Sequence, residues 1–123
     1  MSRQTKIQRY KMGLWAEYFV MILFWFKGHN ILKHRYKCRF GEIDIISKKR
    51  HEIYFLEIKT RKSKKNLEEI ISDSQIGRII DSGEYFLQNN QRFKNCKINY
   101  DLLFLTPTIF PFFRIKYFKN INS

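Results

Sequence analysis

Two carboxylates and a lysine alternate with apolar residues near the middle of this chain. Asp44 lies in the run GEIDII, and Glu57 and Lys59 lie in the run FLEIKTR. Both runs are rich in Ile, Leu and Phe, and a short polar segment separates them, which predicts a β-hairpin. Successive side chains of a strand point to opposite faces, so Glu57 and Lys59 share a face. Two carboxylates beside one ammonium group are a candidate site for a divalent cation.

The register of the hairpin decides whether the two acids meet. If the chain turns at Arg50 and His51, residues whose numbers sum to 101 face each other, and Asp44 faces Glu57. Opposed side chains have Cβ atoms about 5 Å apart, and like charges so close resist joint ionisation. Mg²⁺ or Mn²⁺ would compensate this charge, since Mg²⁺ takes one or two carboxylates and keeps several waters. An ordinary surface hairpin with a Glu–Lys pair would show the same spacing, so both interpretations stay open here.

Length and charge limit the class of protein. With 123 residues, of which 44% are hydrophobic and 17% aromatic, the chain can form one domain with a real core. We expect a single domain over residues 1–123, with its core at about 11–118 and flexible termini. The net charge of +13 predicts a polyanionic partner, bound through phosphate contacts, or an anionic membrane surface. A coding bias towards Lys and Asn would also raise the charge, but it does not explain where the charge clusters.

A strongly apolar run at residues 14–26 follows a basic stretch, as in a signal peptide. However, no small-residue cleavage site follows it, Glu17 interrupts it, and it is shorter than the about 20 residues of a membrane span. We therefore predict a core helix that ends at Gly28, and no membrane partner. Cys38 and Cys96 lie far apart and fit reduced thiols in a cytoplasmic protein, with a single bridge as the alternative.

The rest of the chain predicts layers of helices on a sheet. Strand patterns cover about residues 31–38, 98–106 and 112–118, and a helical pattern covers 67–88 with a break at 72–74. Residues 53–58 are apolar on both faces except at Glu57, which indicates an inner strand. The order helix, three strands, helix and two strands predicts an α/β or α+β fold.

Basic residues lie at both ends of the second strand of the hairpin. Those at the predicted tip are Lys48, Lys49 and Arg50, and those in the loop after the strand are Arg61, Lys62, Lys64 and Lys65. Placed on two sides of a carboxylate cluster, they would contact the phosphate backbone of a nucleic acid without reading its sequence. Lysine runs are also common in solvated turns and loops, which is the alternative for both groups.

These motifs together resemble those of the YraN family, small bacterial proteins of unassigned role that are similar to Holliday-junction resolvases and other restriction-endonuclease-like nucleases. The resemblance is carried by Gly13, Glu17 and Gly28, by RFGEIDII at 39–46, by FLEIKTR at 55–61 and by NYDLL at 99–103. It implies a restriction-endonuclease-like core, with a mixed central sheet flanked by helices. It also implies a nuclease motif at Asp44, Glu57 and Lys59, and Glu17 as a further metal ligand. Because resolvase-like enzymes act as dimers, it implies a homodimer as well.

Three positions depart from the family's pattern. Gln75 stands where the family commonly has Lys in the main helix, although related nucleases use Gln in a similar place. Arg35 stands where the family often has Asn, and His29 where it favours an aromatic residue. The two acids and the lysine are intact, so the departures concern peripheral contacts.

The chemistry implied is metal-dependent hydrolysis of DNA phosphodiester bonds, at branched or repair intermediates. Asp44 and Glu57 would hold Mg²⁺ or Mn²⁺, which activates water, and Lys59 would orient that water or stabilise charge on the phosphate. Glu17 and Gln75 would orient ligands and water, with the alternative that Glu17 is a buried acid paired with a base. Because the family has no assigned reaction, a non-catalytic nucleic-acid-binding protein on the same fold is the second hypothesis.

Overall fold

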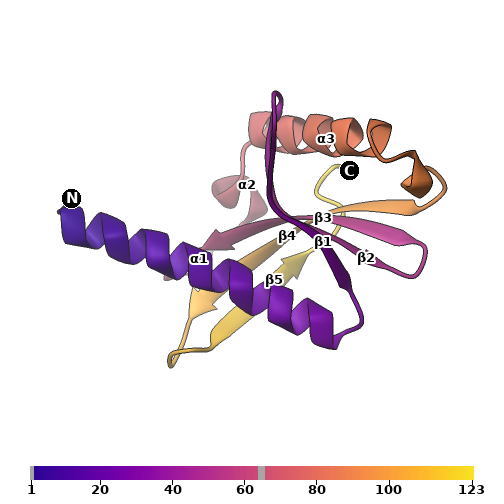
Figure 1. Cartoon of the computed structure of the whole chain (residues 1–123). Helices are drawn as coiled ribbons and strands as arrows, with labels where there is room; N and C mark the ends of the chain where they lie inside the picture. Colours follow the sequence, from indigo (N-terminus) through magenta and orange to yellow (C-terminus); the bar gives the residue numbers. More distant parts are fainter. Residues whose placement is uncertain (1, 64–65) are drawn as a thin grey trace.

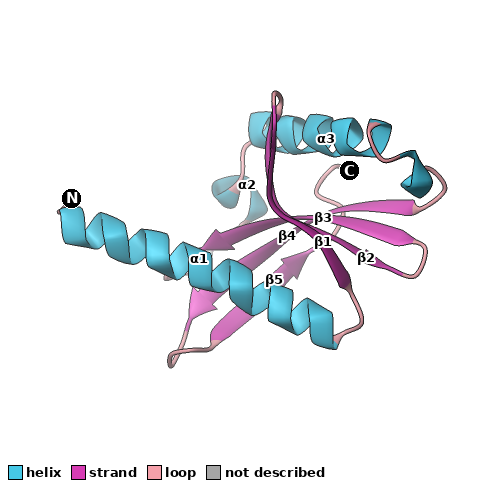
Figure 2. Cartoon of the chain, in the orientation of Figure 1, coloured by secondary structure: helices cyan, strands magenta, loops and turns pink. Residues whose placement is uncertain are grey.

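A computed structural model describes residues 2–63 and 66–123. Within them, five strands form one sheet with helices on both faces (Figures 1 and 2). The elements in chain order are α1 (Arg3–Phe26), β1 (Asn30–Cys38), β2 (Gly41–Lys49), β3 (Glu52–Thr60), α2 (Leu67–Ile70), α3 (Asp73–Gln88), the 3-10 turn η1 (Gln91–Phe93), β4 (Lys97–Pro107) and β5 (Phe113–Phe118). The predicted α+β class, with a mixed sheet between helices, is confirmed.

The sheet has the order β1-β2-β3-β4-β5, so β3 is the central strand, as its two apolar faces predicted. β3 pairs antiparallel with β2 and parallel with β4, whereas β1 and β5 are antiparallel edge strands. A parallel pair needs a long crossover connection, and α2 and α3 lie in the crossover from β3 to β4.

The hairpin of β2 and β3 has the predicted register. Its pairs run from Ile45 opposite Leu56 to Lys49 opposite Glu52, and each pair of residue numbers sums to 101. The turn is made at Arg50, whose φ of 56° lies in the left-handed region. The register therefore brings Asp44 and Glu57 next to each other beyond the last paired residues.

α3 covers one face of the sheet. It begins with a capping box, in which Ser72 and Gln75 each bond the other's backbone N–H, so the predicted break at 72–74 is confirmed. Gly83 allows the helix to approach β4 closely, because a Cβ at this position would lie 2.5 Å from the hydroxyl of Tyr100. The core on this face includes Phe55, Phe86 and Tyr100.

α1 crosses the other face of the sheet (Figure 1) and ends at Phe26, two residues before Gly28, the predicted stop; the φ of Gly28 is +94°. It buries Ala16, Val20 and Phe24 against apolar residues of β2, β3 and β4. Large apolar side chains on this helix are also exposed, namely Ile7, Tyr10, Met12, Tyr18, Ile22, Trp25 and Phe26. The prediction of a core helix therefore holds for one face only. No helix in the described part of the chain is long and apolar enough to cross a membrane.

The two ends of the chain differ from the expected core boundaries. α1 begins at Arg3, well before the apolar run, although its first turns lie mostly in solvent. At the other end, Ile121 is buried in the core under α3, and its N–H donates to the carbonyl of Tyr100 at 2.8 Å. The core therefore extends past residue 118. Both cysteines, Cys38 and Cys96, are free thiols, so the alternative of a bridge between them is wrong.

Candidate active site

Asp44 and Glu57 come together where the pairing of β2 and β3 ends. Ile45 and Leu56 are the last paired residues, and beyond them Oδ2 of Asp44 accepts a hydrogen bond from the backbone N–H of Ile58 at 2.7 Å. The carboxylate thus takes the place of a backbone carbonyl at this end of the ladder. This bond to the backbone of the central strand fixes the position of the Asp44 carboxylate. A side chain on a free loop would lack such a bond.

The two carboxyl groups are close enough to share a proton. Burial and the neighbouring Glu57 together raise the pKa of Asp44 to about 9, and Glu57 acts both by charge repulsion and by hydrogen bonding to the protonated carboxyl. The N–H of Ile58 acts in the opposite direction, and the charge of Glu17 adds a smaller increase. The predicted encounter of the two acids is confirmed, and their role as metal ligands stays a prediction.

Lys59 shares the face of Glu57, as the strand alternation predicted. Its Nζ lies 3.6 Å from Oε2 of Glu57, and the side chains of Lys59 and Glu57 are 19% and 14% exposed. One ammonium group therefore stands beside two carboxyl groups, and negative charge remains in excess when both acids are ionised.

Glu17 approaches from α1, but β1 already holds its carboxylate. Its Oε1 lies 2.7 Å from Nε2 of His34 and accepts a hydrogen bond from Nε of Arg35 at 3.1 Å. Across residues 2–63 and 66–123, no three or more acids, histidines or cysteines are grouped so as to hold a metal. Glu17 as a third ligand stays a prediction, and the alternative of an acid paired with basic residues has direct support in these bonds.

A local distortion of β1 places Arg35 where it can bond Glu17. Arg35 has a φ of 57° and lies opposite Asp44, between the paired residues His34–Ile45 and Tyr36–Ile43. This conformation is uncommon outside glycine, and Asn adopts it more readily than most residues. It therefore gives a physical reason for the Asn that the YraN family often has at this position. In this chain the distorted residue is an arginine, and its side chain bonds Glu17.

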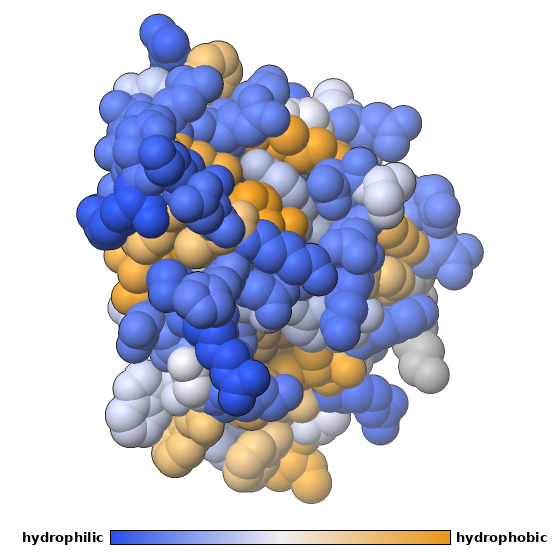
Figure 3. Space-filling view, turned by 90° about the vertical axis from the view of Figure 1, so that its right-hand side faces the viewer, coloured by the Kyte–Doolittle hydropathy of each residue, from blue (hydrophilic) through white to orange (hydrophobic). Residues whose placement is uncertain are grey.

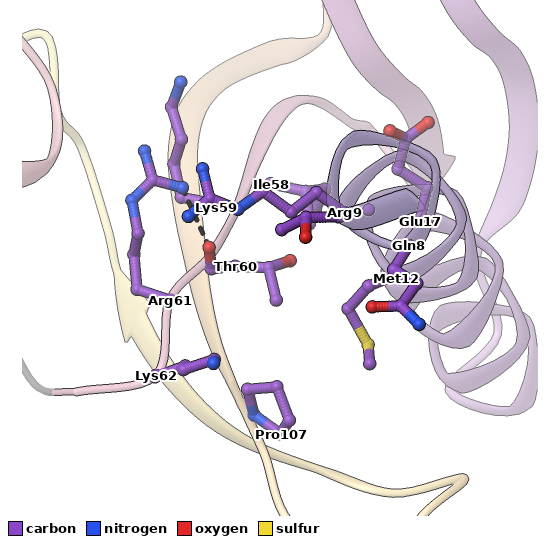
Figure 4. Close-up of a pocket in the computed structure, with 12 residues that line it drawn as sticks. Gln8, Arg9, Met12, Glu17, Ile58, Lys59, Thr60, Arg61, Lys62 and Pro107 are labelled. Carbon is purple, nitrogen blue, oxygen red and sulfur yellow. Dashed lines mark hydrogen bonds between the residues drawn. The ribbon is translucent and has the colours of Figure 1, made fainter. Parts of the chain in front are cut away.

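A cleft of about 1130 Å³ opens beside the acid pair, between α1 and the end of β3 (Figure 4). Its lining includes Glu17, Lys59 and three further cations, Arg9, Arg61 and Lys62. Figure 4 shows the side chains of Lys59, Arg61 and Lys62 gathered on one side of the cleft and α1 on the other. Arg61 and Lys62 belong to the predicted basic loop after β3, and they line the same cleft as Lys59 and Glu17; their contact with a nucleic acid stays a prediction.

Arg9 is a cleft residue that the sequence analysis missed, because it lies in a stretch that resembles the start of a signal peptide. The spacing of residues along the helix could have indicated its role. Arg9, Gly13 and Glu17 are four residues apart on one helix, so they lie on one face, and all three line the cleft. The charge at the start of α1 therefore belongs to the same site as Glu17.

Other predicted residues lie elsewhere. The hairpin tip with Lys48, Lys49 and Arg50 begins four residues from Asp44 along β2, or about 13 Å at 3.3 Å per residue. None of these three residues lines the cleft, and their contact with a nucleic acid stays a prediction. Lys64 and Lys65 fall outside the described residues. Oε1 of Gln75 accepts the N–H of Ser72 at 3.1 Å in the helix cap, and a role for Gln75 in orienting water stays a prediction.

The mixed sheet with helices on both faces, and the acid pair and lysine at the end of its inner strands, are consistent with a restriction-endonuclease-like core. The model of the uncharacterised protein family UPF0102 matches residues 16–104. A UPF0102 protein of Ehrlichia ruminantium (strain Gardel) is 36% identical over 95 residues, which cover 77% of this chain and 73% of that protein. A UPF0102 protein of Ehrlichia chaffeensis is 38% identical over 89 residues, or 70% of this chain and 71% of that protein.

A more distant relative covers more of the chain. A UPF0102 protein of Rhodopseudomonas palustris (strain BisA53) is 29% identical over 106 residues, which are 86% of this chain and 82% of that protein. The chain belongs to the UPF0102 family, the same family that its motifs indicated under the name YraN.

Proposed function

We propose that this protein is a metal-dependent nuclease that hydrolyses phosphodiester bonds in DNA. The observation that carries the proposal is the Asp44–Glu57 pair, whose carboxyl groups meet beside a cleft lined with cations. Acids that repel each other favour binding of a cation, and the basic cleft favours binding of a phosphate backbone. A phosphate backbone with a bound divalent cation uses both features, the acid pair and the basic cleft.

The donor set fits Mg²⁺ or Mn²⁺. Two carboxylates suffice for Mg²⁺, which keeps several waters in its coordination shell. Burial, and then the charge of Glu57, raise the pKa of Asp44, and a bound cation would offset both costs of ionising it. Asp44 and Glu57 would hold the ion. When bound, the ion would activate water and neutralise charge on the phosphate.

The chain's own residues have separate tasks in this proposal. The N–H of Ile58 orients Asp44, and Lys59, held beside Glu57, takes up a proton or stabilises negative charge on the phosphate. Arg9, Arg61 and Lys62 bind phosphates that flank the reacting one. Backbone contacts of this kind select for the shape of DNA, so we extend the proposal to branched or repair intermediates.

One observation favours a second candidate function. The carboxylate of Glu17 is bound to His34 and Arg35, and Lys59 already forms an ion pair with Glu57. Acids engaged in this way also fit a non-catalytic protein that binds nucleic acid through the same cleft. The two functions differ in one property, which is turnover in the presence of a divalent metal.

The test measures single-turnover cleavage of linear and branched DNA with Mg²⁺ or Mn²⁺, beside metal-free binding isotherms. Glu57→Gln removes a ligand charge with little change of shape, so cleavage should fall by about 10³-fold or more, since metal activation contributes several kcal/mol. Its metal-free DNA affinity should persist or rise, because one negative charge facing the phosphates is gone.

Lys59→Ala should also lose cleavage but keep its metal affinity, because an ammonium group has no lone pair for a metal. Glu84→Gln, which changes an exposed acid on α3, serves as the control and should cleave like the wild type. If the wild type binds DNA but cleaves none of the substrates with any divalent metal, and all variants bind alike, the nuclease proposal fails. The non-catalytic binding protein then stands.

A further inference from the structure

A second cavity, of about 570 Å³, opens at the other end of the sheet. It lies where α1 ends, where β3 and β4 begin, and where the chain leaves β5. Figure 3 views the molecule from the side that carries the β2–β3 turn in Figure 1, and the surface there is largely hydrophilic with separate apolar patches. None of the residues of the proposed nuclease site lines this cavity.

Two carboxylates in the cavity are held in place by hydrogen bonds. Asp101 is 2% exposed; its Oδ2 accepts from the hydroxyl of Tyr117 at 2.5 Å and its Oδ1 from the N–H of Asn120 at 2.9 Å. Oε1 of Glu52 accepts from Nδ2 of Asn99 at 3.2 Å. The side chain of Glu52 is 38% exposed, and each carboxylate oxygen can accept two bonds, so Glu52 can accept a further hydrogen bond from a ligand. Asp101 is buried and holds the ring of Tyr117 in place.

Aromatic rings form the walls of the cavity. The rings of Phe24 and Tyr117 are nearly parallel, at 5°, with centroids 6.4 Å apart. The ring of His29 packs on Phe24 and on Tyr54, with centroid distances of 4.5 and 4.7 Å. Burial and the charges of nearby lysines lower the pKa of His29, which favours the neutral form of this ring. Neutral aromatic walls favour a flat ligand that stacks on them.

The third feature is a set of exposed lysines among the lining residues. Lys27 lies at the end of α1, Lys97 at the start of β4 and Lys119 just after β5. The Nζ of Lys97 lies 3.8 Å from Glu52, a loose pair that leaves it able to bind an anion as well. The cavity therefore combines a carboxylate acceptor, aromatic walls and exposed cations.

We propose that this cavity binds a nucleotide whose base carries an exocyclic amino group. Adenine, guanine and cytosine each offer such a donor, from which Glu52 would accept a hydrogen bond, while the base stacks on the aromatic walls and the lysines bind the phosphate. The volume lies within the range of about 300–1,000 Å³ that is usual for small-molecule and cofactor sites. A free nucleotide and an unpaired nucleotide of a DNA strand share this chemistry.

The second source rests on the proposed function. Glu52 and Glu57 are five residues apart on β3, or about 17 Å at 3.3 Å per residue, and the odd spacing places them on opposite faces of the sheet. A DNA strand that held an unpaired nucleotide in this cavity would pass around the sheet to reach the acid pair, over more than the about five steps of B-DNA that span 17 Å. Such binding would hold the unpaired position of branched or gapped DNA several steps away from the cleft.

The first experiment titrates the wild type with the four deoxynucleoside monophosphates and with deoxyadenosine, monitored by calorimetry and by amide NMR shifts. We expect dAMP, dGMP and dCMP to bind about tenfold more tightly than dTMP, because a hydrogen bond to a charged acceptor is stronger than one to a neutral acceptor. The amide shifts should map to the start of β3 and the start of β4.

Variants test recognition of the base and of the phosphate separately. Glu52→Gln, at a side chain that is 38% exposed, should remove most of the preference over dTMP without unfolding the protein. Lys119→Ala should weaken dAMP several-fold and leave deoxyadenosine unchanged, since only the phosphate is affected. Lys94→Ala, an exposed lysine that lines neither cavity, is the matched control. Equal binding of all four nucleotides, no binding at millimolar concentration, or variants that behave like the control would overturn the proposal.

A second arm identifies the source. In metal-free buffer, an oligonucleotide duplex with one unpaired adenine should compete with dAMP more strongly than the fully paired duplex does, and Glu52→Gln should abolish the difference. If dAMP binds as expected but the two duplexes compete alike, the source is a free nucleotide and the cavity proposal stands. Since no arm needs cleavage, loss of the nuclease proposal and loss of this proposal remain distinguishable.

Discussion

Asp44 and Asp101 are partly or fully buried acids near opposite ends of the same sheet, and their surroundings differ. Asp101 accepts two hydrogen bonds, from Tyr117 and from the N–H of Asn120. Asp44 accepts one from the N–H of Ile58, and its other close neighbour is the acid Glu57. One end therefore satisfies its carboxylate with donors, whereas the other places a second acid beside it. An acid pair without enough donors suits a cation, and a satisfied acid suits a structural or recognition role.

The two ends acquire this difference from the backbone around them. At Asp44 the ladder of β2 and β3 ends, and Arg35 distorts β1 on the other side. At Asp101 the strand is paired with β3, the pairing with β5 begins at the next residue, and the end of the chain folds back so that the N–H of Asn120 donates to the carboxylate. Four measurements test whether the contrast is real.

The largest expected effect is on metal affinity. Glu57→Gln should weaken Mn²⁺ binding about 100-fold, because a ligand charge a few ångströms from the ion contributes several kcal/mol even at an effective dielectric of about 20. Glu52→Gln, at the other end of the strand, should change Mn²⁺ affinity by less than about twofold, because charges that far apart are screened by salt. Calorimetric titration with MnCl₂ measures both. Equal losses in the two variants would mean that the ends do not differ as cation sites.

The second effect is on stability at the satisfied end. Asp101→Ala should lower the free energy of unfolding by about 2–3 kcal/mol, because it leaves the hydroxyl of Tyr117 and the N–H of Asn120 without their acceptor. Urea unfolding monitored by circular dichroism measures the change, and Asp101→Asn, which keeps one acceptor oxygen, should lose less. A loss below about 0.5 kcal/mol, the usual range for surface substitutions, would contradict this account of Asp101.

The third effect is a gain in the free energy of unfolding at the Asp44 end, opposite in sign to the loss at Asp101, and it depends on pH. The folded-state pKa of Asp44 is raised from 3.8, so the folded protein holds a proton that the unfolded chain releases. The contribution of Asp44 to stability is therefore fully present below about pH 4 and is lost as the pH rises through the neutral range. Asp44→Asn should stabilise the metal-free protein at pH 8 by about 1–2 kcal/mol.

Unfolding curves of the wild type and Asp44→Asn at pH 5, 6.5 and 8 check this prediction. The variant should show a flatter dependence on pH, and Mg²⁺ should stabilise the wild type more at pH 8 than at pH 5, since the metal binds the deprotonated acid. A variant that is less stable than the wild type at pH 8 without metal would show that Asp44 is satisfied like Asp101.

The smallest effect concerns the cations of the cleft. Arg9→Ala and Lys62→Ala should each reduce the slope of log affinity for duplex DNA against log salt by about 0.9, the value for one lost phosphate contact. Lys94→Ala, which lines neither cavity, is the control. Lys48→Ala tests the hairpin tip in the same assay. If the cleft variants keep the wild-type slope, the DNA-binding surface lies elsewhere.

Much of the fold and part of the site were predictable because their signals are local. The alternation of apolar residues and the short turn set the register of β2 and β3, so the encounter of Asp44 and Glu57 followed from counting residues. The same count places Lys48 to Arg50 four to six residues from Asp44, so it neither brings the hairpin tip to the acids nor excludes its contact with a bound nucleic acid. The breaks at Gly28 and Ser72 were read from single capping residues.

The sequence alone determined the order of the elements, the central position of β3, the acid pair and the lysine beside it, because strand and helix periods act between near neighbours. Only the tertiary structure decided what α1 contributes. Packing of this helix across the sheet brings Arg9 to the cleft and holds Glu17 against His34 and Arg35. It also decided the second cavity, where the end of α1, the start of β4 and the residues after β5 meet. Contacts between segments so distant in the chain depend on how whole elements pack, and no local period encodes that packing.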